Sequence, residues 1–157
     1  MTVRIDVQAD APGLYAALLT VSTAVMKAGL PERLRHLIDL RVSQINGCAY
    51  CIGLHTDWAL GAGERRERLE ALAGWPDSDL FDAAERAALA WAEALTRCRS
   101  DQLDALHGDL RQHFDAAAAA AVTMAVATIN AWNRIGIARH RAAAAAAPAT
   151  APAAATA

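Results

Sequence analysis

Residues 48–55 of this chain read CAYCIGLH, and this stretch decides how the rest of the sequence is interpreted. Cys48 and Cys51 stand three residues apart, and His55 follows four residues after the second cysteine. The turn dipeptide Asn46-Gly47 comes just before them and predicts the end of one helix and the start of another. Residues three and four apart share a helix face, so both sulfurs and the imidazole are expected to point the same way. The positive end of the helix dipole favours a thiolate, which is the reactive form of cysteine.

The composition excludes several classes of function. The chain has 157 residues, a length typical of one domain, and a formal net charge of -2, so its charge does not favour nucleic acid or an anionic membrane. Its three cysteines argue against a disulfide scaffold, and residues 1–10 are polar, without the apolar segment of an export signal. We therefore expect a cytoplasmic protein, in a reducing compartment where a C-x-x-C pair is more often catalytic or metal-binding than structural.

Apolar residues recur at helical spacing along most of the chain, and no segment shows the alternation of a strand. Residues 1–10 are expected to be an extended lead-in, and residues 75–79 a loop. Asp82, with Glu85 three residues later, resembles a capping box, and Asp101 is expected to cap the helix after it. The expected fold class is all-α, with about seven helices. Their expected ranges are 12–27, 31–45, 48–60, 64–73, 82–97, 103–113 and 116–141.

Two Ala-rich segments near the end of the chain need separate interpretations. Residues 116–129 are apolar, but this stretch is shorter than the roughly 20 residues needed to cross a bilayer. We therefore expect a buried core helix or a subunit-interface helix, and no membrane contact. Residues 142–157 contain Ala, Pro and Thr without a large apolar side chain, so they are expected to be disordered. The predicted organisation is one domain over residues 1–141 followed by this tail.

Three separate segments resemble one known family. Residues 41–51, RVSQINGCAYC, together with His55 resemble the signature of the carboxymuconolactone decarboxylase-like superfamily, in its alkylhydroperoxidase D branch. Residues 85–96, ERAALAWAEALT, resemble the next core helix of that family. Residues 129–134, INAWNR, resemble its late helix. The matches follow the order of the family and together span most of residues 30–140.

The resemblance implies an AhpD-like helical fold that assembles as a homo-oligomer. It also implies a thiol-dependent peroxidase, in which Cys51 attacks a hydroperoxide and becomes a sulfenic acid. Cys48 would then close a disulfide with it, and His55 would belong to a proton relay. A dithiol or a lipoyl-type redox partner would reduce the disulfide, and no cofactor is implied. Because Cys48 is at the helix start, we expect it to lie nearer solvent, where an external dithiol can reach it.

One position departs from the family pattern. The relay glutamate of the family stands twelve residues before the first cysteine, where this chain has His36. An imidazole titrates near neutral pH and can serve as a general base. His36 is therefore counted as a candidate catalytic residue, together with Cys48, Cys51 and His55.

Two other functions stay open on the sequence. One is a lactone decarboxylase-type enzyme on the same fold, although such enzymes generally lack the cysteine pair. The other is a non-catalytic oligomer that binds zinc or a partner, because Cys48, Cys51, His55 and His36 together offer two sulfur and two imidazole ligands. The third cysteine, Cys98, is expected in the core or in a subunit interface rather than in redox chemistry.

Overall fold

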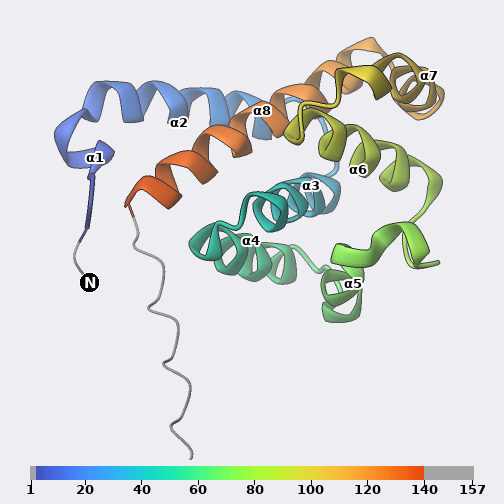
Figure 1. The fold of residues 1–157 in the computed structure, drawn as a ribbon, viewed down its shortest axis with the longest axis horizontal. Helices are drawn as coiled ribbons and strands as arrows, with labels where there is room; N and C mark the ends of the chain where they lie inside the picture. The colour runs from blue at the N-terminus through green and yellow to red at the C-terminus, as the bar shows by residue number, and fades with distance from the viewer. Residues whose placement is uncertain (1–2, 140–157) are drawn as a thin grey trace, which may run out of the picture.

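The computed structural model describes residues 3–139, and across that range it contains only helices and connecting turns, with no strand (Figure 1). This confirms the all-α prediction, with eight α-helices where about seven were expected. The predicted tail at 142–157 and the domain end at residue 141 lie outside the described residues. The α-helices are α1 (Val7–Asp10), α2 (Pro12–Met26), α3 (Glu32–Asn46), α4 (Ala49–Gly61), α5 (Arg66–Ala71), α6 (Ala83–Thr96), α7 (Leu103–His113) and α8 (Ala116–Arg139). Two short 3-10 helices are η1 (Leu72–Asp77) and η2 (Ser100–Gln102).

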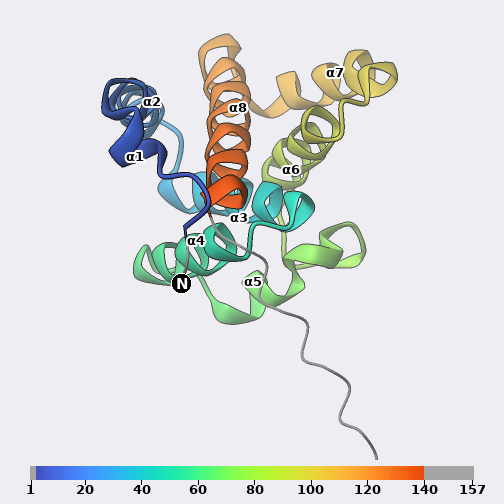
Figure 2. The ribbon, with the colours of Figure 1, turned by 60° about the vertical axis from the view of Figure 1, so that its left-hand side comes forward.

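Helix α3 lies at the centre of the fold. It packs against α4, α6 and α8, and Figure 2 shows it between these helices. Ile38 and Val42 belong to one apolar cluster with residues of α6 and α8, while Leu37 and Leu40 belong to a second with residues of α4, α5 and η1. Neighbours on so many sides bury α3 almost all round, including polar side chains between its apolar stripes.

The first residues do not form the expected extended lead-in, because residues 7–10 make the short helix α1. The carboxylate of Asp6 caps it by accepting a hydrogen bond from the N–H of Ala9 at 3.2 Å. Arg139, at the end of α8, holds this segment in place. Its guanidinium lies 3.0 Å from Asp6, and its carbonyl accepts from the N–H of Arg4 at 3.0 Å. The two ends of the described chain therefore meet.

The capping box at the start of α6 is confirmed in both directions. Asp82 Oδ1 accepts from the N–H of Glu85 at 2.9 Å, and Glu85 Oε2 accepts from the N–H of Asp82 at 3.0 Å. The prediction that Asp101 caps α7 is wrong. Asp101 lies in η2, and its carboxylate pairs with the exposed side chain of Arg99 at 3.3 Å.

The helix predicted for residues 64–73 is also wrong in extent. Helix α5 covers only Arg66–Ala71, and η1 then continues through Asp77, across residues expected to form a loop. The reason is burial. Leu72 and Trp75 are both buried in the second apolar cluster, and the tighter 3-10 turn of η1 places them there.

Helix α8 has 24 residues and is apolar enough, by length and composition alone, to cross a bilayer. It packs instead against α2, α3 and α6, and Val122, Val126 and Ile129 are buried in the first apolar cluster. The prediction of a core helix is therefore confirmed.

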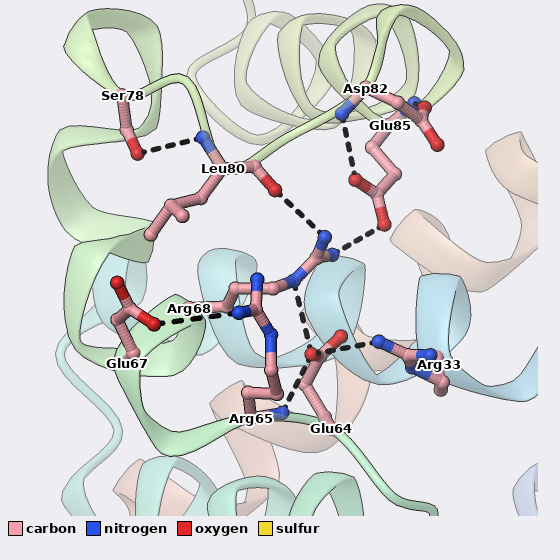
Figure 3. Close-up of polar contacts among 9 residues, drawn as sticks. All are labelled: Arg33, Glu64, Arg65, Glu67, Arg68, Ser78, Leu80, Asp82 and Glu85. Atoms are coloured by element: carbon pink, nitrogen blue, oxygen red, sulfur yellow. Dashed lines mark hydrogen bonds and ion pairs between the residues drawn. The ribbon is translucent and has the colours of Figure 1, made fainter.

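A buried ion cluster fastens the segment after α4 to α3 and α6 (Figure 3). The side chain of Glu64 is fully buried, and its Oε1 lies 3.1 Å from Arg33 and 3.0 Å from Arg68. Arg68 also pairs with Glu85 and donates to the carbonyl of Leu80 at 2.8 Å. By contrast, Figure 3 shows the nearby pair Arg65–Glu67, in which both side chains are more than half exposed.

Glu64→Gln is expected to lower the free energy of unfolding by roughly 2–3 kcal/mol, because it removes a buried charge that two arginines need as a partner. Glu67→Gln is the matched control, and its exposed pair should contribute less than about 0.5 kcal/mol. Urea denaturation of both variants at one protein concentration measures the difference. Equal losses for the two variants would show that the cluster does not fasten this segment.

Candidate active site

The Asn46-Gly47 turn places the first cysteine at the start of α4. Gly47 ends α3 in the left-handed conformation, with a φ of 69°, which a glycine adopts without strain. Cys48 is the N-cap residue of α4, and its Sγ accepts a hydrogen bond from the N–H of Cys51 at 3.3 Å. The two cysteines are joined by a disulfide. The prediction of a cysteine pair at a helix start is therefore confirmed.

The expectation that Cys48 lies nearer solvent is wrong. Cys48 is 2% exposed and Cys51 is 4% exposed, so the first cysteine is at least as buried as the second. Gly136 of α8 lies directly against them. A Cβ atom at that position would stand 3.0 Å from the Sγ of Cys48 and 3.1 Å from that of Cys51. Only a residue without a side chain lets α8 approach the disulfide so closely.

A network of asparagines holds α8 against the turn that precedes Cys48. The Nδ2 of Asn46 donates to Asn133 Oδ1 at 2.8 Å and to Asn130 Oδ1 at 3.0 Å. The fully buried Asn133 also donates to the hydroxyl of Ser43 on α3 at 2.9 Å. Buried polar networks with their partners satisfied favour one arrangement of the packed helices. This network therefore fixes the position of Gly136 over the sulfurs.

Gly136→Ala is expected to destabilise the oxidised protein by about 1–3 kcal/mol, the usual cost of overpacking. Gly53→Ala, on exposed α4 surface with no atom near its added Cβ, is the matched control and should stabilise by up to about 1 kcal/mol. Both changes replace a helical glycine, so the difference between their urea midpoints isolates the contact with the disulfide. Stabilisation by both would mean that α8 can move away from the sulfurs freely.

His55 lies one turn after Cys51 on α4 and faces a carboxylate of α3. Its Nδ1 is 3.6 Å from the Oδ2 of Asp39, and both side chains are about nine-tenths buried. Asp39 Oδ2 in turn lies 3.3 Å from the guanidinium of Arg35, one turn earlier on α3. The chain thus supplies a carboxylate partner for His55 from a position other than the family's glutamate.

Burial shifts the pKa values of Asp39 and His55 in opposite directions. Burial raises the pKa of Asp39 to about 7, even though the Arg35 guanidinium beside it acts to lower that pKa. Burial, together with the nearby His36 and Arg35, lowers the pKa of His55 to about 4. Near neutral pH, His55 is therefore uncharged and able to accept a proton, while Asp39 is near its midpoint. Such opposed shifts are typical of groups that transfer protons.

His36 is buried on α3, and its ring centroid is 6.4 Å from that of His55. Its Nε2 lies 3.3 Å from the guanidinium of Arg35 and 3.7 Å from Glu32. Burial and the Arg35 charge lower the pKa of His36, against the effect of Glu32. No hydrogen bond connects the two rings directly. The structure thus places His36 beside both Arg35 and His55, and it joins Cys48 to Cys51 at the start of the helix that carries His55.

The four-ligand zinc set suggested by the sequence is not assembled in this state, since the two cysteines bind each other. The described residues hold another donor set, because ligand atoms of His36, Asp39 and His55 all lie within 4.8 Å of one another. Arg35 argues against a metal there. Its permanent positive charge lies 3.3 Å from both Asp39 and His36, where it would repel a divalent cation. The cluster is better suited to protons than to a metal.

A pocket of about 550 Å³ leads to this group from the space between α2, α4 and α8. Cys51, His55, Asp39 and Arg35 all line it, whereas Cys48 and His36 do not. The rest of its wall is mostly apolar and includes Leu19 of α2. Trp132 of α8 stacks edge-on against Tyr15 of α2, with ring centroids 5.1 Å apart, and both rings line the pocket.

Comparison with known proteins assigns the family. The model of the carboxymuconolactone decarboxylase family matches residues 12–94, which is more than half of the chain. The chain belongs to this family. The uncharacterised protein YdfG of Bacillus subtilis (strain 168), a relative, is 33% identical over 145 residues, covering 92% of this chain and 99% of that protein.

Solved structures of similar proteins support an AhpD-like form of the carboxymuconolactone decarboxylase fold. ATU0492 of Agrobacterium tumefaciens, a protein of unknown function proposed as an antioxidant defence protein AhpD, superimposes with a TM-score of 0.83 at 32% identity. That match covers 87% of this chain and 94% of ATU0492. The debrominase Bmp8 shares the fold with a TM-score of 0.73 at 24% identity, over 81% of this chain and 69% of its own.

Within this member of the carboxymuconolactone decarboxylase family, sequence reasoning missed Asp39, Arg35 and Gly136. Asp39 carried one usable signal, because it interrupts the otherwise apolar run LIDL at residues 37–40 of α3. A charge within such a run is either exposed or held by partners. The expectation of a core position for Cys98 is wrong for the chain alone, since Cys98 is exposed. Its place in a subunit interface stays a prediction.

Proposed function

We propose that this chain is a thiol-dependent peroxidase that reduces organic hydroperoxides through Cys51. The observation that carries the proposal is the position of the Cys51 sulfur. It is paired with a second cysteine, and it lines a pocket whose other polar lining includes a neutral imidazole and its carboxylate partner. A nucleophile, a base and a group that orients the base are the components of an activated thiol site.

The reaction divides into two steps that balance. The Cys51 thiolate attacks the outer peroxide oxygen, the O–O bond breaks, and the alkoxide leaves with a proton to become an alcohol. Cys51 is then a sulfenic acid. The Cys48 thiolate attacks the sulfur of that sulfenic acid, the S–O bond breaks, and the leaving hydroxide takes up the proton that the Cys48 thiol gave up, so that water and the Cys48–Cys51 disulfide form. His55 accepts the thiol proton, and Asp39 stabilises the resulting imidazolium when it is ionised.

The shape and lining of the pocket also favour one class of substrate, an organic hydroperoxide, and one class of reductant, a small dithiol. Its largely apolar wall, with Tyr15, Trp58 and Trp132, favours a hydroperoxide with a hydrocarbon body over hydrogen peroxide. Regeneration needs a dithiol, and a dithiol on a slender arm, such as a lipoyl group, can enter a pocket that a flat protein surface cannot. A reducing cytoplasm is part of this proposal, since each cycle consumes a dithiol.

Steady-state turnover tests the proposal. Purified protein is given cumene hydroperoxide or hydrogen peroxide, with dihydrolipoamide as reductant, and peroxide loss is followed. We expect catalytic consumption of both, with the higher kcat/KM for cumene hydroperoxide. No turnover with either peroxide, in protein whose cysteine pair cycles between dithiol and disulfide, would reject peroxidase function.

The two alternative functions give different results in the same preparation. A lactone decarboxylase-type enzyme would lack peroxide turnover and would retain its activity after both cysteines were replaced. A zinc-binding oligomer would contain about one zinc per chain by elemental analysis. We expect neither result, because the sulfur of Cys51 lines the pocket and Arg35 opposes a cation beside His55.

We also propose that the chain forms a homo-oligomer with a second copy covering α2. Val25 is the only buried residue of α2, while Leu14 is 74% exposed and Met26 is 62% exposed. Helix α8 was the other candidate for a subunit interface, but its Ile129 is buried in the chain's own core. The exposed apolar surface of α2 therefore carries this proposal. Light scattering at micromolar concentration tests it, and a mass near 16.6 kDa would contradict it.

A further inference from the structure

The two sulfurs of the disulfide differ in their access to the pocket. Cys51 lines it, whereas Cys48 does not. Helix α8 covers both sulfurs at Gly136, since an added Cβ would stand 3.0 Å from Cys48 Sγ and 3.1 Å from Cys51 Sγ, so the pocket is what distinguishes them. The asparagine network holds α8 in that position. A molecule that enters the pocket therefore meets the sulfur of Cys51 first.

The two sulfurs also differ as leaving groups. In thiol–disulfide exchange, the sulfur that is not attacked departs as a thiolate, and a more stable thiolate departs faster. Cys48 is the N-cap of α4, and its Sγ already accepts the N–H of Cys51 at 3.3 Å. The helix N-terminus and this hydrogen bond stabilise a negative charge on Cys48. Access and leaving-group stability thus favour the same direction of exchange.

We infer that the reductant enters the pocket and attacks Cys51, so that Cys48 is released as the thiolate. The reductant's thiolate forms a bond to the Cys51 sulfur while the Cys48–Cys51 bond breaks. The second thiol of the reductant then attacks its own sulfur in this mixed disulfide. The reductant leaves as a cyclic disulfide, oxidised by two electrons, and both cysteines are again thiols or thiolates.

This inference rests on the proposed function only for the physiological use of the disulfide. It has a kinetic consequence if that function holds, because peroxide and reductant then react at one sulfur through one pocket. The reductant would also occupy the pocket of the dithiol form, where it competes with peroxide. Peroxide would likewise occupy the pocket of the disulfide form, where it competes with the reductant. Turnover should therefore follow ping-pong kinetics, with inhibition by the reductant at high concentration.

The first test identifies the attacked sulfur without any peroxide. Oxidised wild-type protein is mixed with 2-mercaptoethanol, quenched in acid within seconds, and treated with N-ethylmaleimide before peptide mass spectrometry. We expect the mercaptoethanol adduct on Cys51 and the maleimide on Cys48. The reverse pattern, with the adduct mainly on Cys48, would overturn the inference.

A second test narrows the pocket. Leu19 of α2 lines it, whereas Asp57, on the exposed surface of α4, does not. Leu19→Trp should slow reduction of the disulfide by 2-mercaptoethanol roughly tenfold or more, because access controls exchange, whereas Asp57→Trp should leave the rate unchanged. Equal rates in the two variants would overturn the inference. An adduct on Cys51 in protein that turns over no peroxide would uphold it while rejecting the peroxidase function.

Discussion

Replacement of Cys51 by serine is expected to reduce peroxide consumption to the rate of the buffer, because no other thiol lines the pocket among the described residues. Cys48→Ser is expected to behave differently. The Cys51 thiolate remains, so one equivalent of peroxide per chain should react and leave a sulfenic acid. Without its partner that sulfenic acid cannot become the intramolecular disulfide, and turnover by the normal cycle should stop.

Peroxide loss measured by colorimetry, and trapping of the sulfenic acid with dimedone, distinguish these two outcomes. Cys98→Ser is the matched control, since Cys98 is exposed and outside the pocket, and it should retain full activity. If Cys51→Ser kept more than a small fraction of wild-type turnover while Cys48→Ser lost it, the roles of the two cysteines would have to be exchanged.

The second large effect is expected for Asp39→Asn. In the wild type, peroxide reduction should become faster as pH rises through about 7, because Asp39 loses its proton there and its carboxylate then stabilises a protonated His55. The asparagine cannot ionise, so this step in the pH profile should disappear. General base catalysis typically contributes 10²–10⁴-fold, and we expect a loss of roughly 100-fold at pH 8.

Stopped-flow rates from pH 5.5 to 9, with thiolate formation followed separately by ultraviolet absorbance, measure the effect. Asp57→Asn provides the control, because Asp57 lies on exposed α4 surface outside the pocket. An Asp39→Asn variant with an unchanged profile would show that Asp39 does not act on His55.

The same substitution should change how stability depends on pH. The raised pKa of Asp39 gives stability that is present below about pH 4 and lost as pH rises toward 7. The lowered pKa of His55 does the opposite, since its contribution is present above 6.5 and lost as pH falls toward 4. Between pH 4 and 6.5 the pH dependences of these two contributions to stability have opposite signs and nearly cancel in the wild type. Asp39→Asn should therefore become more stable as pH rises from 4 to 6.5, by up to about 1.4 kcal/mol per pH unit more steeply than the wild type. Urea midpoints measured across this range provide the test.

Local rules accounted for the start of α4 and for the cap of α6, because each depends on residues within four positions of one another. The Asn46-Gly47 turn and the Asp82–Glu85 capping box are of this kind. Asp39 was beyond such rules. Apolar residues at helical spacing predict one buried face for a helix, whereas α4, α6 and α8 surround α3 and bury further faces. Which helices surround another is a property of the whole fold, and no spacing within α3 contains it.

The role of Gly136 could not be predicted from the sequence for a related reason, since its contact with Cys48 and Cys51 joins residues far apart in the chain. Its importance comes from the two sulfurs beneath it, and a glycine in a helix has no pattern that indicates what it touches. The prediction that Cys48 lies nearer solvent was wrong for the same reason, because the contact that buries Cys48 also comes from a distant part of the chain. A position at a helix start usually faces solvent, but here α8 covers it.

The cover that α8 places over the disulfide also has a consequence during synthesis of the protein. Gly136 follows Cys51 by 85 residues, so the cysteine pair leaves the ribosome long before the helix that will enclose it. At about 5–20 residues per second, the interval is roughly 4–17 s. Through that interval the nascent thiols face the reductants and oxidants of the cell directly. Each molecule therefore acquires its first redox state before its own fold can control access to the sulfurs.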